Sequence, residues 1–180
     1  MPSVSTHRGI KRAGADSAGF SLVEILVVVM VILIIAAIAI PNLVHGKMRA
    51  NEAAAVASVK AVDSAQTMYL NAYPEIGYAG NLTSLGTNGT TCEKPSSTAS
   101  CLIMDEALAS GMKSGYLFEI VGDGNKPSGA YVVSATPESS LSGRCAVSSN
   151  QGGELRMSVP GTTVSVGGRS VSDGSSGCDL

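Results

Sequence analysis

The sequence predicts an α+β protein in which a long, kinked N-terminal helix, membrane-spanning in its first half, packs on a C-terminal antiparallel β-sheet. Three observations lead to this class. Residues 20–40 form an almost uncharged apolar run, good helix formers continue beyond it, and short alternating segments separated by turn residues fill the second half. At 180 residues the chain has the length of about one domain.

The composition argues against nucleic-acid binding. The formal net charge is −2, and the chain has 2 Phe, 5 Tyr and 0 Trp. Proteins that bind nucleic acids need a basic surface to neutralise phosphates and often aromatic side chains on which bases stack. No nucleic-acid partner is therefore predicted.

The apolar run is long enough to cross a membrane. Residues 20–40 read FSLVEILVVVMVILIIAAIAI, in which Glu24 is the charged residue. A helix of this length rises about 31 Å, which matches a hydrocarbon core of about 30 Å. Arg8, Lys11 and Arg12 precede the run, so the positive-inside rule keeps the N-terminal side in the cytoplasm. The remainder of the chain is expected outside.

Glu24 needs a positively charged partner. A carboxylate at membrane depth costs a few kcal/mol and normally marks a pairing or a functional site. The nearest cations in the sequence, Arg12 and Lys47, lie far along the chain. Cleavage before Phe20 would create an α-amino group four residues from Glu24, positively charged near neutral pH. We therefore expect proteolysis to produce the missing cation.

Two simpler interpretations of the run are a secretory signal peptide and an ordinary single-span anchor. Ala37-Ile38-Ala39 has the small-residue pattern of a signal-peptide cleavage site. However, the run is longer than the usual 7 to 15 residues and has an acid near its start. The simple anchor also leaves Glu24 unexplained.

The segment Gly19-Phe20-Ser21-Leu22-Val23-Glu24, followed by an unbroken apolar stretch, resembles the cleavage and methylation signal of type IV pilins and type II secretion pseudopilins. The resemblance implies cleavage between Gly19 and Phe20 by a prepilin peptidase, which also methylates the amine of Phe20. Residues 1–19 would then be a cleaved leader. Glu24 would recruit and register subunits during assembly, because its carboxylate can neutralise the amine of a neighbouring subunit inside an apolar core.

The same resemblance implies the partners and the location. The expected partners are further copies of the chain in a homopolymeric filament, the prepilin peptidase and methyltransferase, an inner-membrane assembly platform, an assembly ATPase and minor pilins. The chain would be a single-pass inner-membrane protein with its C-terminus outside before assembly. Afterwards it would form an extracellular pilus or a periplasmic filament.

Residues 41–73 are expected to form the amphipathic half of the helix. An apolar stripe at helical spacing should face the sheet, whereas Lys60, Asp63 and Asn71 should tend to the other side. Pro74 predicts an end near residue 72, and Pro41 predicts a kink or a locally melted turn. The family implies partial unwinding at such a proline in the filament. The stripe consists of Ala55, Val59, Val62, Gln66, Tyr69 and Tyr73.

Residues 74–180 are expected to form a globular head. Residues 81–100 are interpreted as a surface loop, and residues 102–111 as a short helix with Asp105 as its N-cap and Gly111 as its stop. A four-stranded antiparallel sheet is predicted from residues 116–121, 130–135, 144–148 and 155–159. The tail, 161–180, is expected to form a further strand pair, Val164/Val166 with Val171, or a loose edge. The head also resembles that of type IV pilins and major pseudopilins.

The four cysteines, Cys92, Cys101, Cys145 and Cys178, favour disulfides because the head is placed outside the cytoplasm. Three pairings are possible. We prefer Cys92 with Cys101, which closes a loop, and Cys145 with Cys178, which ties the tail to the sheet. A zinc site is disfavoured because the cysteines lack Cys-x2-Cys spacing and both histidines lie outside the head.

No metal or cofactor is predicted. Asp123-Gly124-Asn125 is interpreted as a turn rather than as part of a calcium site, because the acidic spacing of an EF-hand loop is missing. The sequence also lacks a nucleophile elbow, a Walker loop and a His-Glu-x-x-His motif, so we do not expect the protein to be an enzyme.

The prediction is a structural subunit of a type IV pilus, polymerised through its hydrophobic N-terminal helix. Two alternatives stay open. One is a type II secretion pseudopilin that forms a periplasmic piston, and the other is a monomeric, single-span, membrane-anchored binding domain.

Overall fold

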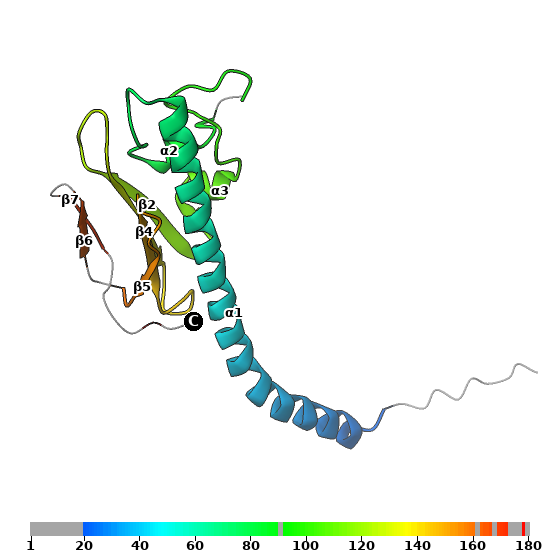
Figure 1. The fold of residues 1–180 in the computed structure, drawn as a ribbon. Helices are drawn as coiled ribbons and strands as arrows, with labels where there is room; N and C mark the ends of the chain where they lie inside the picture. The colour runs from blue at the N-terminus through cyan, green and yellow to red at the C-terminus, as the bar shows by residue number, and fades with distance from the viewer. Residues whose placement is uncertain (1–19, 90–91, 161–162, 167–168, 173–177, 179–180) are drawn as a thin grey trace, which may run out of the picture. The chain divides into compact units, whose positions relative to one another are not determined.

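The computed structural model describes residues 20–89, 92–160, 163–166, 169–172 and 178. A long helix, α1 (Leu22–Ala72), is followed by a head that contains two short helices, a five-stranded sheet and a two-stranded hairpin (Figure 1). The predicted α+β class, a long helix with an antiparallel sheet, is confirmed. The chain divides into two compact units, one ending at Ile40 and the other beginning at Pro41.

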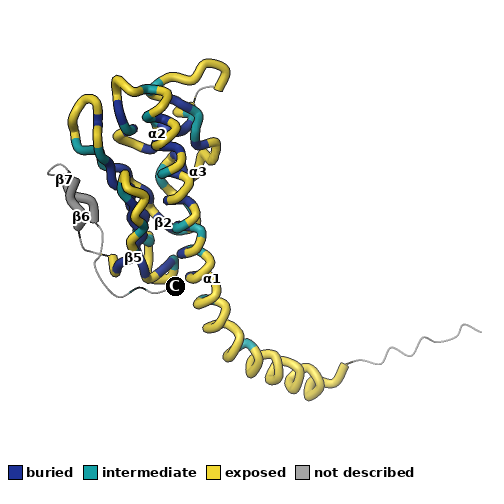
Figure 2. The backbone as a smooth tube through the Cα atoms, viewed as in Figure 1, coloured by how far each residue is buried: buried dark blue, intermediate teal, exposed yellow. Residues whose placement is uncertain are grey.

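Within the first unit, the helix exposes its apolar side chains on all sides. Phe20, Leu22 and Leu33 are 79%, 79% and 64% exposed, and Figure 2 shows almost the whole segment as exposed. A helix that is hydrophobic all round is stable when lipid or other protein surrounds it. This segment therefore depends on an environment that the single chain does not supply.

The helical assignment continues through Pro41 without a break. Of the kink or locally melted turn that we expected from this proline, the melted turn is not seen in the structure of the single chain. Proline removes one N–H donor from the ladder, and the hydrogen bonds on either side are enough to hold the helical turn. The helix ends at Ala72, as Pro74 predicted.

Within the second unit, the predicted stripe on α1 is confirmed. Its first five members, from Ala55 to Tyr69, are at most 3% exposed, and Tyr73 is half-buried. Gln66 is fully buried, and both polar atoms of its side-chain amide are hydrogen-bonded to the backbone of Ala79. Its Nε2 donates to the Ala79 carbonyl at 2.8 Å, and its Oε1 accepts the Ala79 N–H at 2.8 Å. This pair fixes the chain that leaves the helix against the stripe.

The main sheet has five antiparallel strands in the order β1-β2-β3-β4-β5. Four of them match the predicted strands to within two residues. The fifth, β1, was missed because two residues are too short to show the alternation of a strand. The strands are β1 (Met112–Lys113), β2 (Tyr116–Gly122), β3 (Tyr131–Pro137), β4 (Ala146–Asn150) and β5 (Arg156–Ser158).

One face of this sheet packs on α1, and the opposite face is covered by the tail. The α1-facing side chains join the helical stripe in a single core; they are Tyr116, Phe118, Ile120, Tyr131, Val133, Ala135 and Val147. On the opposite face Val132 and Ser134 are each 3% exposed. The hairpin of β6 (Thr163–Val166) and β7 (Arg169–Ser172) contacts this region through β2 and β3, and it pairs Val164 with Val171 as predicted.

The segment 81–100 is not purely a loop. It contains a short helix, α2 (Leu82–Leu85), whose N-cap Asn81 accepts the Ser84 N–H at 2.8 Å. The polar residues of this segment predicted a loop. In the structure, however, Leu82 and Leu85 are buried, with 6% and 0% exposure. The second short helix, α3 (Glu106–Ala109), has the predicted N-cap Asp105 but begins later than the predicted residue 102.

Candidate functional site

The start of α1 lies next to Phe20 and contains Glu24, two residues of the expected processing and assembly site. The helix begins at Leu22, and the Ser21 carbonyl accepts the N–H groups of Glu24 at 3.1 Å and Ile25 at 3.3 Å. Glu24 therefore lies in the first turn, where the helix dipole favours a negative charge. Phe20 precedes the helix and is 79% exposed, whereas Gly19 lies outside the described residues.

Glu24 has no ion-pair partner within the described part of the chain. The ion pairs found there join Lys113 to Asp105 and Arg156 to Glu154, both in the head. The neighbours of Glu24 in sequence are exposed apolar residues, among them Val23 and Ile25. The carboxylate is thus an unpaired charge within an apolar helical surface, which is the arrangement that a counter-ion from outside the chain would stabilise.

The long apolar stretch qualifies as one candidate membrane span by length and composition, with a mean hydropathy of 3.3 over its most apolar part and none of that part buried within the structure. Residues 15–40 match the family model described as the prokaryotic N-terminal methylation motif. The resemblance to the type IV pilin and pseudopilin family is thereby confirmed.

Curated relatives that the chain resembles include type II secretion system core protein G from three bacteria. The identities are 38% over 58 residues for Escherichia coli K12, 35% over 66 residues for Pectobacterium carotovorum and 37% over 60 residues for Aeromonas hydrophila. Each match covers 32 to 35% of the chain and 40 to 42% of the relative, so the chain spans about two fifths of these proteins. No solved structure gives a significant match.

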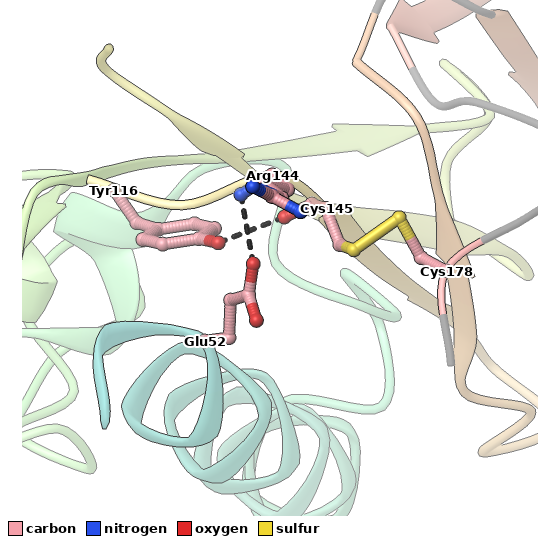
Figure 3. Close-up of a disulfide and its surroundings, with 5 residues drawn as sticks. All are labelled: Glu52, Tyr116, Arg144, Cys145 and Cys178. Carbon is pink, nitrogen blue, oxygen red and sulfur yellow. Dashed lines mark hydrogen bonds between the residues drawn. A yellow bond between two sulfur atoms is a disulfide. The ribbon is translucent and has the colours of Figure 1, made fainter. Parts of the chain in front are cut away.

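In the head, α1 holds the β3–β4 connection by two side chains. Asn51 Nδ2 donates to the Ser142 carbonyl at 2.9 Å, and the Glu52 carboxylate accepts the Arg144 N–H at 2.7 Å. Figure 3 shows Glu52 pointing from α1 to this backbone. Glu52 is 8% exposed, so its hydrogen bond is shielded from solvent. The contact anchors the segment that leads into Cys145.

Tyr116 supports the same segment from β2. Its hydroxyl donates to the Cys145 carbonyl at 2.8 Å, and burial, together with the nearby Glu52 carboxylate, raises the pKa of Tyr116 (Figure 3). The phenol therefore stays protonated and remains a donor at all physiological pH values. A side chain at Gly143 would collide with the Tyr116 hydroxyl, so the loop passes this ring because residue 143 is a glycine.

Both preferred cysteine pairings are present as disulfides. Cys92 is bonded to Cys101, with the Cα atoms 5.9 Å apart and a sequence separation of 9. Cys145 is bonded to Cys178, also with a Cα distance of 5.9 Å, and with a sequence separation of 33. The second bond ties the end of the tail to the segment that Glu52 and Tyr116 hold, so the hairpin β6–β7 is attached to the sheet at both of its ends.

Asp123 organises the turn between β2 and β3, in keeping with its interpretation as a turn residue. One carboxylate oxygen accepts from the Asn125 N–H and the Ser128 hydroxyl at 3.0 Å, and the other accepts from Asn125 Nδ2 and the Gly129 N–H at 3.1 Å. These hydrogen bonds, led by the Asn125 N–H, lower the pKa of Asp123. Among the described residues, no group of three or more His, Cys, Asp or Glu side chains is placed to hold a metal ion.

Asp63 lies differently from what we expected. It was assigned to the side of α1 away from the sheet, but it is half-buried and accepts the Tyr131 hydroxyl at 2.9 Å. Burial raises the pKa of Asp63, although the hydrogen bond from the Tyr131 hydroxyl opposes that change. Because residue 63 follows Val62 and lies one turn after Val59, it borders the buried stripe and reaches the sheet.

We expect Asp63→Asn to become more stabilising, relative to wild type, as the pH rises from 3 to 7. A raised pKa means that the native state holds its proton above the pH at which the unfolded chain releases it. Stability therefore falls as pH rises from the unfolded pKa through the folded one. Asparagine keeps an acceptor for Tyr131 but does not ionise, so it lacks this loss.

The measurement is the difference in melting temperature between Asp63→Asn and wild type at several pH values. Taking the difference removes the opposite contributions of Asp105 and Asp123, whose pKa values are lowered. A difference that stays constant between pH 3 and pH 7 would show that Asp63 titrates equally in the folded and unfolded chains.

Glu52, Arg144 and Tyr116 were not singled out as site residues from the sequence, and Asp63 was assigned to the wrong side of α1. A signal for Glu52 was available, because the helical stripe extends backwards through residues 52 and 48, and both Glu52 and Met48 are buried. An acid on an otherwise apolar stripe predicts a buried hydrogen bond. The partners of Glu52 and Asp63 come from strands and loops far along the chain, and no local pattern reveals them.

Proposed function

We propose that this chain is the structural subunit of a type IV pilus. Cleavage between Gly19 and Phe20 creates the amine of Phe20, which is then methylated, and the apolar helix 20–40 leaves the membrane to form the filament core. The supporting observation is an unpaired Glu24 in the first turn of an exposed apolar helix, within the segment that matches the methylation motif.

The chemistry of assembly follows from the cost of burying charge. Neither the amine of Phe20 nor the carboxylate of Glu24 is stable alone in an apolar core, whereas an amine from one copy and a carboxylate from the next satisfy each other. The pairing thus favours one axial register between copies. Apolar contacts along residues 20–40 supply the non-directional part of the interaction.

In this proposal residues 1–19 are the leader, 20–40 the membrane and core segment, 41–73 the amphipathic half of the helix, and 74–180 the head. Pro41 is the point at which the helix unwinds during assembly. The proposed partners are other copies, the prepilin peptidase and methyltransferase, the assembly platform, the assembly ATPase and minor pilins. The role is structural, and no catalytic step is assigned to the chain.

A type II secretion pseudopilin is the second candidate. It is supported by the three relatives named as type II secretion system core protein G. The alignments cover about a third of the chain and about two fifths of each relative, so the secretion role of the relatives is a proposal for this chain. The two disulfides of the head, which suit an extracellular surface, favour the pilus.

The position of the filament distinguishes the two candidates. Immunogold electron microscopy of cells that express the chain at its natural level is expected to show labelled fibres that extend from the surface. Labelled assemblies confined to the periplasm would replace the pilus with the pseudopilin. A processed chain without any assembly would contradict both candidates and favour a monomeric anchored domain.

A further inference from the structure

A groove runs beside the first turns of α1 in the head unit. One part, of about 660 Å³, lies between α1 and the β3–β4 connection, and a second part, of about 620 Å³, continues to the Cys145–Cys178 disulfide. The two parts share His45, Met48 and Arg144, so they form one continuous hollow. Neither the core nor the filament proposal uses it.

The two parts of the groove differ in chemistry. The first is lined by apolar side chains, including Val44, Pro137, Leu141 and Pro160, and Leu141 is 68% exposed. The second is lined by two exposed arginines, Arg49 and Arg144. The hollow is therefore mainly apolar at one end and cationic at the other, and Arg144 lines both parts.

The two arginines are held near each other but are not neutralised by the residues that the structure describes. No carboxylate among those residues forms an ion pair with Arg49 or Arg144. Glu52 also lines the groove, but one of its oxygens is engaged by the Arg144 N–H at 2.7 Å and the residue is 8% exposed. Glu52 thus positions Arg144 through its backbone, and no carboxylate of the described residues pairs with the Arg144 guanidinium.

The position of the groove along the chain places it at the lipid headgroups. Val44 and His45 follow Ile40, the end of the uninterrupted apolar run, by four and five residues on the same helix. At about 1.5 Å per residue this interval is roughly 6 to 8 Å, close to the depth of one headgroup layer. Cationic side chains at this level attract anionic lipids.

We propose that this groove binds an anionic phospholipid while the chain is anchored in the membrane. The phosphate pairs with Arg49 and Arg144, and the glycerol and first acyl carbons lie against Val44 and Leu141. A carboxylate from a second copy or a free phosphate would satisfy the arginines but would leave the apolar half exposed. This site goes beyond the filament proposal and does not depend on cleavage at Gly19.

Native mass spectrometry of the full chain in nanodiscs with equal amounts of phosphatidylglycerol and phosphatidylcholine tests the proposal. We expect wild type to retain phosphatidylglycerol about tenfold more often than phosphatidylcholine, as two favourable cations predict. The double variant Arg49→Gln/Arg144→Gln should retain the two lipids about equally. A matched control, Lys60→Gln/Arg156→Gln, removes two exposed cations outside the groove and should behave as wild type.

The variant Leu141→Ser distinguishes binding of a phospholipid from binding of inorganic phosphate. This exposed change should reduce phosphatidylglycerol retention several-fold and leave the melting temperature unchanged, because it alters the apolar half alone. The proposal would be overturned if wild type showed no preference for phosphatidylglycerol, or if both double variants lost that preference equally. It would also be overturned if Leu141→Ser left phosphatidylglycerol retention unchanged while inorganic phosphate displaced the lipid completely. Protein dimers that carry no lipid would likewise contradict it.

Discussion

Replacing Glu24 by alanine is expected to abolish filaments while leaving a processed protein inserted in the membrane. Alanine removes the carboxylate that neutralises the amine of Phe20, so each added copy would bury an unpaired positive charge in the core. Membrane insertion should be undiminished, because the variant no longer places a charge at membrane depth. We expect the filament yield to fall at least 100-fold.

The measurement is the amount of chain in sheared filaments relative to the membrane fraction. Glu24→Gln should fail as completely as alanine, since a neutral amide cannot neutralise an amine. Glu75→Ala, which changes an exposed glutamate of the head, is the control and should assemble normally. Filaments at normal yield from Glu24→Ala would mean that the residue is dispensable, as a simple membrane anchor predicts.

Removing the Cys145–Cys178 disulfide is expected to cause the largest loss of stability in the head. In the chain-entropy model a bond that spans 33 residues stabilises by about 3 to 4 kcal/mol, whereas one that spans 9 residues stabilises by about 2.5 kcal/mol. The loss corresponds to a fall of roughly 10 °C in melting temperature for a domain of this size. The hairpin β6–β7 would also lose its second attachment to the sheet.

Thermal unfolding of the full chain in detergent, with Cys145→Ser/Cys178→Ser compared against Cys92→Ser/Cys101→Ser, checks this expectation. Limited proteolysis should cut the tail of the first variant sooner than that of the second. A smaller loss from the Cys145–Cys178 pair than from the Cys92–Cys101 pair would show that Glu52, Tyr116 and the hairpin hold the tail without the bond.

Features that depend on neighbouring residues could be predicted from the sequence. The spacing from Ala55 to Tyr69 identified the buried face of α1, and Pro74 identified its end, because helical periodicity and proline geometry act within a few residues. The alternation in β2 and the Asp105 N-cap are local in the same way. These elements were placed to within a few residues.

Features that depend on tertiary contacts were missed or misplaced. Leu82 and Leu85 lie among polar residues, and α2 forms because the core buries them. Asp63 looked like a solvent-exposed acid until Tyr131, 68 residues further on, supplied a donor. The groove between α1 and the β3–β4 connection is likewise invisible in the sequence, since Arg49 and Arg144 lie 95 positions apart.

The candidate site shows the same division. Gly19, Phe20 and Glu24 lie within the short segment 19–24, so the expected processing signal could be identified from local sequence alone. The methylation motif matches residues 15–40, which include this segment. The proposed counter-ion of Glu24 is the amine of Phe20 on a neighbouring copy, so a single copy shows a carboxylate without an ion-pair partner among the described residues.

Mass spectrometry of the N-terminal peptide from the exported chain tests the central claim most directly, with Gly19→Leu as a variant that should remain uncut. The account predicts a mature chain that starts with N-methylated Phe20. A chain that starts near Ile40, as a signal peptide would produce, or one that retains residues 1–19, as a simple anchor would, contradicts it.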